Sequence, residues 1–241
     1  MRRGLPLAFI AFGLMAPAAH AQISVGHGCT AAEHSLGNRL ISFAAYANGP
    51  LSARAHPGGS TVRAFAKMNP NGVKTVFGVL GVVNSTDCTP AWYRVQLPIR
   101  PNGATGFVRA DAVTLYPVRT RIHVDLSAKR LDFYRDGRRL LSTRVGIGTS
   151  DTPTPTGRYY VNQRLWDLDV GSPFGPGAVG ISAFSPVLKS WAQGGPVAIH
   201  GTDDPSSVGR AASHGCIRVE NDLMRRLLRA TMTGSPVVIH A

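Results

Sequence analysis

Short runs that alternate apolar and polar residues fill most of the chain, and this pattern is typical of β-strands. In the first half the apolar runs cover residues 73–83, 92–97 and 106–109. Turn sequences rich in Asn, Gly and Pro separate them, at residues 48–50, 57–59, 69–72 and 101–103. Because short strands recur here with turn signals between them, this half predicts a small β-barrel.

The second half predicts further strands. Residues 122–126 alternate in polarity, and residues 130–135 repeat the alternation before Asp136-Gly137, a dipeptide typical of hairpin turns. Residues 140–145 then form the returning strand. Residues 164–196 are rich in Gly, Pro and Ser and have no clear period, so we expect a functional loop or lid there.

Only one helix is clearly indicated. Its apolar face consists of Leu223, Met224, Leu227 and Leu228. Asn221 is the expected N-cap, and residues 236–239 are the expected last strand. We therefore predict a mainly β fold, with a small N-terminal β-barrel over residues 22–118 and a β-rich domain with one helix over residues 119–241.

Residues 1–21 have the layout of a secretory signal peptide. Arg2 and Arg3 precede an apolar run over residues 5–15, and Ala19-His20-Ala21 offers small residues at a cleavage site. The run is shorter than the roughly 20 residues that a membrane-spanning helix needs. We expect an exported protein of the periplasm or cell wall, without a membrane span.

Charge and cysteine content indicate which partners to expect and which cysteine is free. The formal net charge of +13 suits a polyanionic surface such as a bacterial envelope. Lys and Arg are scattered rather than clustered, so nucleic acid is not an expected partner. Three cysteines in an oxidising compartment leave one unpaired. The simplest pairing joins Cys29 to Cys88 and leaves Cys216 free, although sequence does not fix the connectivity.

Chemically active side chains concentrate in one segment. It consists of Ser213, His214, Gly215, Cys216, Ile217 and Arg218. A thiol beside an imidazole suits nucleophilic acyl transfer, because the thiolate attacks and a neighbouring base produces it. Backbone N–H groups around Gly215 and Cys216 suit an oxyanion. The guanidinium of Arg218 suits a substrate carboxylate.

Two histidines are candidates for the base. His200 follows the apolar run 197–199, so it lies at a strand end, whereas His214 is two residues from Cys216. A catalytic imidazole needs an acceptor for its second nitrogen. Asp203-Asp204 is close in sequence, and the carbonyl of Gly201 is the alternative.

Metal binding is not expected. His27, Cys29 and His34 do not match a zinc spacing. A zinc ion on the candidate histidines and Cys216 would lack an evident fourth ligand. We expect no metal and no cofactor.

Four segments in order along the chain resemble the L,D-transpeptidase catalytic domain, also called the YkuD domain. They are residues 154–157, 199–202, 213–218 and 234–239. Residues 92–109 resemble part of a bacterial Src-homology-3-like domain. A peptidase of the NlpC type normally places its cysteine before its histidine, and here His200 precedes Cys216.

The resemblance implies a role for each candidate site residue. Cys216 is the implied nucleophile and His200 the implied base, oriented by the Gly201 carbonyl. His214, Gly215 and the Cys216 amide line the implied oxyanion site. Ser213 and Arg218 complete the set by supporting the motif and contacting the substrate. Relatives often carry Asp at the position of Leu223, so one supporting contact is in doubt.

The implied substrates are peptidoglycan stem peptides, joined by 3→3 cross-links through a thioester. Carbapenem-type β-lactams would acylate the same thiol. If water resolves the thioester, the enzyme is an L,D-carboxypeptidase. A third alternative is a non-catalytic wall-binding protein in which the N-terminal barrel is the working part.

Overall fold

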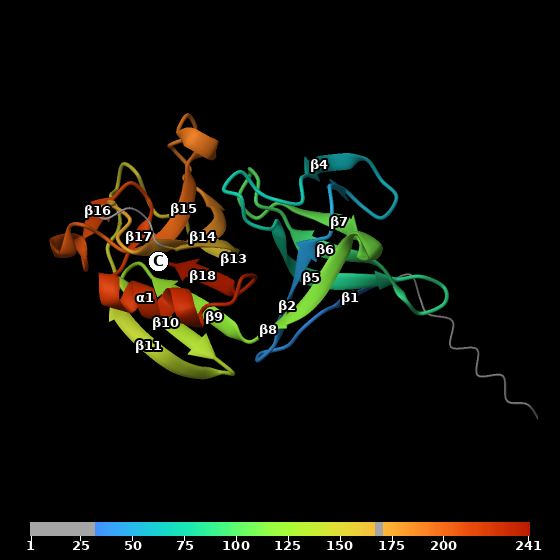
Figure 1. Ribbon diagram of the computed structural model, residues 1–241, viewed down its shortest axis with the longest axis horizontal. Coiled ribbons are helices and arrows are strands. Elements are labelled where there is room, and N and C mark those ends of the chain that lie inside the picture. Colours follow the sequence, from blue (N-terminus) through green and yellow to red (C-terminus); the bar gives the residue numbers. More distant parts are fainter. Residues whose placement is uncertain (1–31, 167–170) are drawn as a thin grey trace, which may run out of the picture.

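The computed structural model describes residues 32–166 and 171–241, which form two β-rich lobes side by side (Figure 1). The first lobe ends with strand β8 at Val118, and the second begins with strand β9 at Thr120. The predicted fold class, mainly β with one clear helix, is confirmed. The expected signal peptide and Cys29 lie outside the described residues. Cys88 is disulfide-bonded and Cys216 is a free thiol.

The first lobe is one eight-stranded sheet. Its elements are β1 (Glu33–Ser35), β2 (Ser42–Ala47), β3 (Leu51–Arg54), β4 (Thr61–Phe65), β5 (Val76–Asn84), β6 (Pro90–Gln96), β7 (Thr105–Arg109), the 3-10 turn η1 (Ala110–Ala112) and β8 (Val113–Val118). The strand order is β4-β3-β7-β6-β5-β2-β8, and β1 pairs with β5. Small and β-branched residues fill its core, around Phe77, Val95 and Val108. The likeness of this lobe to a Src-homology-3-like domain stays a prediction.

The second lobe holds a larger core. Its elements are β9 (Thr120–Asp125), β10 (Arg130–Arg135), β11 (Arg138–Arg144), β12 (Ile147–Gly148), β13 (Gly157–Trp166), β14 (Gly177–Phe184), η2 (Ala192–Gly194), β15 (Pro196–His200), η3 (Pro205–Ser207), β16 (Ala211–Ser213), β17 (Ile217–Arg218), α1 (Asn221–Ala230) and β18 (Pro236–His240). The strand order is β11-β10-β9-β18-β13-β14-β15-β17, and β12 pairs with β16. As predicted, Asp136 and Gly137 turn the β10–β11 hairpin, with φ of 50° and 78°.

The single helix closes this core. Helix α1 packs against β14 and buries Met224, Leu227 and Leu228. The helix was predicted correctly, but its expected cap was wrong, because Glu220 occupies the N-cap position and makes no side-chain cap. Asn221 is the first helical residue, and its side chain is engaged elsewhere. No helix among the described residues is long and apolar enough to cross a membrane.

Residues 164–196 are only partly the loop that the sequence predicts. Strand β13 continues to Trp166, and β14 occupies residues 177–184. Seven of the eight residues of β14 are buried, so both of its faces are covered and apolar and polar positions do not alternate. This strand therefore lacks the period that marks a half-exposed strand. The irregular part around the site comprises residues 171–176 and 185–195.

A shared apolar cluster joins the two lobes. Ala44, Val76 and Val118 of the first lobe pack with Tyr160 of β13. The Tyr160 hydroxyl donates to the Val76 carbonyl oxygen at 2.9 Å. The ring of Tyr160 lies where a side chain of Gly78 would stand. The lobes are therefore packed together as one body rather than tethered.

Gly234 provides a test of this packing. Its φ is +81°, and a side-chain carbon there would collide with the Cβ of Ala44. Gly58 has a similar φ of +73° but open space around it, so Gly58→Ala is a matched control. We expect Gly234→Ala to lower the free energy of unfolding by about 1–3 kcal/mol more than Gly58→Ala does. Urea unfolding measures the difference, and equal losses would contradict the described packing.

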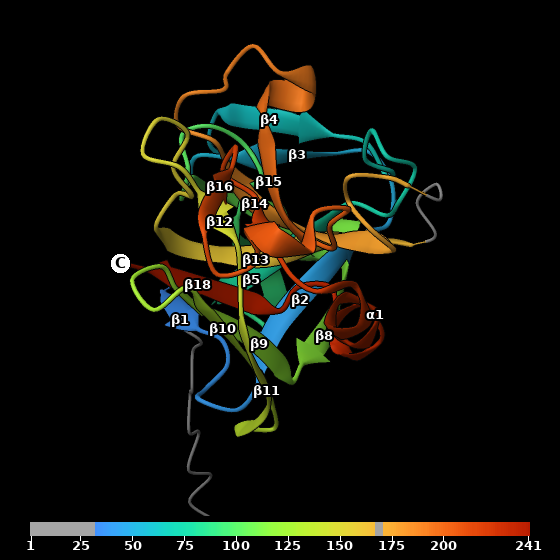
Figure 2. The ribbon, with the colours of Figure 1, turned by 90° about the vertical axis from the view of Figure 1, so that its left-hand side faces the viewer.

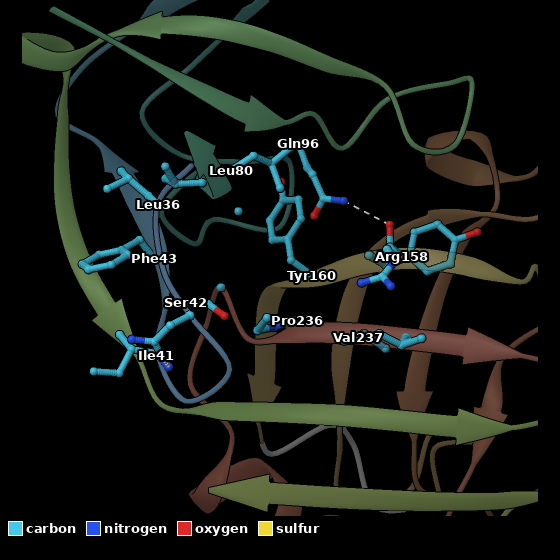
Figure 3. Close-up of a pocket in the computed structure, with 16 residues that line it drawn as sticks. Leu36, Ile41, Ser42, Phe43, Leu80, Gln96, Arg158, Tyr160, Pro236 and Val237 are labelled. Carbon is cyan, nitrogen blue, oxygen red and sulfur yellow. Dashed lines mark hydrogen bonds between the residues drawn. The ribbon is translucent and has the colours of Figure 1, made fainter. Parts of the chain in front are cut away.

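Beside the shared cluster, the interface is hollow (Figure 3). A cavity of about 220 Å³ lies between the lobes, with Leu36, Phe43 and Leu80 on one side and Arg158 and Val237 on the other. The side-chain amide of Gln96 donates to the Arg158 carbonyl oxygen at 3.1 Å across the gap. None of the candidate site residues lines this cavity. It is a feature of the interface rather than of the site.

Candidate active site

Strand pairing brings the candidate base and nucleophile together. Strand β17 runs parallel to β15, with Ile199 opposite Ile217 and His200 opposite Arg218. Cys216 directly precedes β17, and this register makes it level with Ala198, two residues before His200. Figure 2 views the molecule from the side of this lobe, with β15 rising toward the loop above it. The pairing therefore aligns the segment of the free thiol Cys216 with the strand that ends at the buried His200.

The turn that carries the thiol is held by its own hydrogen bonds. The Ser213 hydroxyl donates to the Cys216 carbonyl oxygen at 2.5 Å and accepts from the Gly215 N–H at 3.1 Å. The Thr152 hydroxyl and the Thr149 N–H both donate to the Ser213 carbonyl oxygen at 3.1 Å. Gly215 has a φ of +111°, which disfavours any residue with a side chain. Ser213 is buried and its hydroxyl is used within the turn, so the expected contact with a substrate stays a prediction.

These bonds also decide which amide is available to an oxyanion. The Gly215 N–H is engaged by the Ser213 hydroxyl. Of the two amides that the sequence suggests, the Cys216 N–H is therefore the one suited to an oxyanion. His214, two residues before Cys216, is exposed. Gly215 contributes the shape of the turn.

His200 is almost fully buried, with 3% of its surface exposed. Its Nδ1 lies 2.5 Å from the Gly201 carbonyl oxygen, so Nδ1–H donates there and Nε2 is the basic nitrogen. Burial lowers the pKa of His200 from 6.5 to about 4; the Gly201 hydrogen bond opposes this and the Arg218 charge adds to it. Asp204 does not orient His200, since its carboxylate accepts from Ser206.

The pKa of the Cys216 thiol is shifted upward, which keeps the thiol protonated. Burial raises the pKa of Cys216 above its ordinary value of 9.0, and a backbone hydrogen bond with Ala198 and the Arg218 charge oppose the rise. The low pKa of His200 and the high pKa of Cys216 together make the resting pair a neutral thiol and a neutral imidazole. The proton therefore moves during attack rather than before it.

Alkylation of Cys216 by iodoacetamide tests this charge state. Because the thiolate fraction rises about tenfold per pH unit below the thiol pKa, we expect the rate to rise about tenfold per unit from pH 7 to 9. Mass spectrometry of the Cys216 peptide measures it. A rate that is flat over this range would show a preformed thiolate–imidazolium pair instead.

One side-chain N–H of Arg218 has no hydrogen-bond acceptor among the described residues. Its backbone is paired with Gly146, with N–H···O distances of 2.8 and 2.9 Å in the two directions. Its Nε is buried and has no hydrogen-bond partner among residues 32–166 and 171–241. A buried charged donor without a partner is costly, so this geometry favours a bound acceptor such as a carboxylate or carbonyl oxygen.

Two exposed aromatic side chains flank the histidines. The ring of Phe174 meets His200 edge-on, with centroids 4.9 Å apart at 79°. The ring of Trp191 lies 5.4 Å from that of His214. About half of each aromatic residue is exposed. The sequence predicted a functional loop or lid over residues 164–196 but gave no signal for Phe174, because its contact with His200 depends on the folded path of the chain.

Asn221 fixes the backbone that follows the base. Its side-chain oxygen accepts from the Thr202 N–H at 2.9 Å. Side-chain carbons at Gly201 or Gly175 would collide with the same oxygen, which explains glycine at both positions. The residue that sequence reasoning placed as a helix cap is thus a positioning residue for the loop after His200. Within the part of the chain that the structure describes, no group of three or more His, Cys, Asp or Glu is arranged to hold a metal ion.

The second lobe matches a known protein family. Residues 119–239 match the YkuD family model, described as the L,D-transpeptidase catalytic domain. The match covers half of the chain and includes His200, Cys216 and Arg218. The chain belongs to the L,D-transpeptidase family.

Two Bacillus members of this family show the relationship in sequence. YkuD of Bacillus subtilis (strain 168), named as an L,D-transpeptidase, is 32% identical over 125 residues, which are 52% of this chain and 68% of that protein. YkuD of Bacillus licheniformis is 33% identical over 119 residues, which are 49% of this chain and 64% of that protein. Both alignments cover about half of the chain.

Solved L,D-transpeptidase structures are similar over the same extent. A crystal structure of a mutant Enterococcus faecium L,D-transpeptidase has 28% identity and a TM-score of 0.40, covering 50% of this chain and 49% of that one. An NMR structure of the Enterococcus faecium catalytic domain acylated by ertapenem has 29% identity and a TM-score of 0.40, covering 50% of this chain and 96% of that one. The chain thus spans about half the length of the crystallised enzyme.

Proposed function

We propose that this protein is an exported L,D-transpeptidase that forms 3→3 cross-links between peptidoglycan stem peptides through a thioester on Cys216. The observation that supports the proposal is the β15–β17 pairing, which aligns the segment of the free thiol Cys216 with the strand that ends at the buried His200. The signal-peptide pattern of residues 1–21 supports export to the periplasm or cell wall.

Acylation follows from the neutral pair. The Cys216 sulfur attacks the carbonyl carbon of the third, L-centred stem residue while the thiol proton moves to Nε2 of His200. The Cys216 N–H and His214 stabilise the oxyanion. When the intermediate collapses, the C–N bond breaks, His200 returns the proton to the departing D-residue amine, and a thioester remains.

Deacylation repeats the steps with a second stem. Its side-chain amine attacks the thioester carbonyl and gives up a proton to His200, and the sulfur leaves as the thiol. The new amide inherits the free energy of the old peptide bond, so no nucleotide is required. If water attacks instead, the product is a shortened stem, which is the L,D-carboxypeptidase alternative.

Arg218 binds the donor stem in this scheme. Its buried, unpartnered Nε suits a carboxylate or carbonyl oxygen of the stem. Lysine keeps the charge but lacks the guanidinium fork, so we expect Arg218→Lys to raise KM about tenfold and to change kcat less. Steady-state kinetics with a disaccharide-tetrapeptide measure the split. A fall in kcat alone would assign Arg218 to the chemical step instead.

Intact mass spectrometry tests the proposed function. Purified protein is incubated with a carbapenem and, separately, with a disaccharide-tetrapeptide. A covalent adduct mapped to Cys216, together with a cross-linked dimer, is the expected result. Tripeptide without dimer would favour the carboxypeptidase. No adduct and no product from the reduced protein would leave the non-catalytic wall-binding protein.

A further inference from the structure

The loop of residues 185–195 stands over the candidate site and carries Trp191. Its base is closed by a hydrogen bond from the Ser185 N–H to the Gly195 carbonyl oxygen at 2.8 Å. The ring of Trp191 lies 5.4 Å from that of His214, two residues before Cys216. In Figure 2 this segment rises at the top of the molecule as an orange loop with a short helical turn.

Arg100 of the first lobe ties both ends of this loop. Its Nη2 donates to the Ser185 carbonyl oxygen and to the Gly194 carbonyl oxygen, each at 2.7 Å. Its guanidinium also lies over the Phe184 ring, 5.4 Å from the centroid. One charged group therefore satisfies a carbonyl at each end of the loop, and charge-assisted bonds of this kind are stronger than neutral ones.

Asn102 holds the residue from which the loop departs. Its side-chain amide donates to the Phe184 carbonyl oxygen at 2.8 Å, and its side-chain oxygen accepts from the Phe184 N–H at 2.9 Å. At the far side of the loop, the Gln193 amide donates to the Asn71 side-chain oxygen at 2.9 Å. Asn71, Arg100 and Asn102 all lie outside the residues that match the family model, 119–239.

We propose that Arg100 and Asn102 are positioning residues through which the first lobe keeps Trp191 over the entrance to Cys216. The loop contains adjacent residues in the left-handed region, Gln193, Gly194 and Gly195, and such backbone has alternative conformations when released. Holding it in one conformation lowers the entropy lost when a substrate binds. The inference rests on the proposed function, since it concerns how a stem peptide reaches the thiol.

The effect falls on binding rather than on chemistry. The base lies on β15, which pairs with β14 and β17, and the turn that carries the nucleophile is held by the Ser213 hydroxyl. We expect Arg100→Ala and Asn102→Ala each to raise KM for a disaccharide-tetrapeptide about tenfold and to leave kcat within about threefold. Arg109→Ala is the matched control, because Arg109 of the first lobe also lies over an aromatic ring, that of Trp92, and its ion pair is with Asp111 rather than with the loop.

A double-mutant cycle separates positioning from general destabilisation. If Arg100 acts through Trp191, Arg100→Ala adds little to KM once Trp191→Ala is present. If Arg100→Ala raises KM by the same factor with and without Trp191→Ala, the proposal is overturned. Arg100→Lys keeps the charge and a donor, so it should recover part of the loss.

Tryptic cleavage after Lys189 reports on the loop without any activity. Lys189 is exposed within the loop, and we expect Arg100→Ala and Asn102→Ala to speed cleavage there about tenfold, with Arg109→Ala unchanged. Unchanged cleavage would overturn the proposal even in an active enzyme. If the wild-type protein forms neither adduct nor product, the proposed function fails, and cleavage at Lys189 still decides whether the first lobe holds the loop.

Discussion

Replacing Cys216 by alanine is expected to lower kcat for cross-linking by about a million-fold, the scale expected when the nucleophile of a cooperating group is removed. No other thiol among the described residues is free to replace it. The substitution removes one half-buried sulfur, so the fold should persist. Product analysis with a disaccharide-tetrapeptide measures the activity, and unfolding by urea confirms stability.

Cys216→Ser is the sharper control. It keeps the size and the hydrogen-bonding capacity of the side chain but replaces a thiol by a hydroxyl, which is a much weaker nucleophile without a strong base. We expect no carbapenem adduct with either variant. Wild-type levels of product from Cys216→Ala would rule out acyl transfer through this residue.

Replacing His200 by asparagine should lower kcat by about 10³–10⁴-fold, because no group remains to take the thiol proton. The asparagine amide stands near the position of Nδ1 and retains a donor for the Gly201 carbonyl oxygen. His200→Ala loses that donor as well. Similar kcat for these two variants, with stability lower only for alanine, would separate the base from the hydrogen bond.

The His200→Asn variant should also change how the free energy of unfolding depends on pH. The pKa of His200 is about 4 in the folded protein and 6.5 ordinarily, so the unfolded chain binds the proton first as the pH falls. His200 therefore lowers the stability of the wild-type protein by about 3 kcal/mol between about pH 6.5 and pH 4, and this contribution does not grow below that range. His200→Asn should lack this loss. Urea unfolding at pH 7 and pH 4 measures it, and equal losses would refute the buried neutral imidazole.

Local chemistry made parts of this structure predictable. The backbone preferences of Asp136-Gly137 favour a hairpin turn. The spacing of the apolar residues from Leu223 to Leu228 predicts the apolar face of α1. The four motif segments located the candidate site, but the approach of His200 to Cys216 followed from family resemblance rather than from spacing. The strand pairing of β15 with β17 brings the two chain segments side by side, with His200 opposite Arg218.

What the sequence missed depends on contacts between distant residues. Strand β14 was not predicted because its neighbours bury both of its faces. Its sequence therefore lacks the alternation of apolar and polar residues that marks a half-exposed strand. Asn221 has the residue type of a helix cap, yet the Thr202 N–H competes for its oxygen. Arg100 and Asn102 lie in a turn that carries no sign of a partner more than eighty residues away.

The cluster around Tyr160 has a consequence for how the chain can be divided. Tyr160 belongs to the second lobe by sequence, but its ring is covered by Gly78 and its hydroxyl is satisfied by Val76 of the first. A fragment starting at residue 119 would expose this ring to water, and the Tyr160 hydroxyl would lose its hydrogen bond to Val76. We expect such a fragment to self-associate and the full chain to melt in one transition, as a single folding unit would.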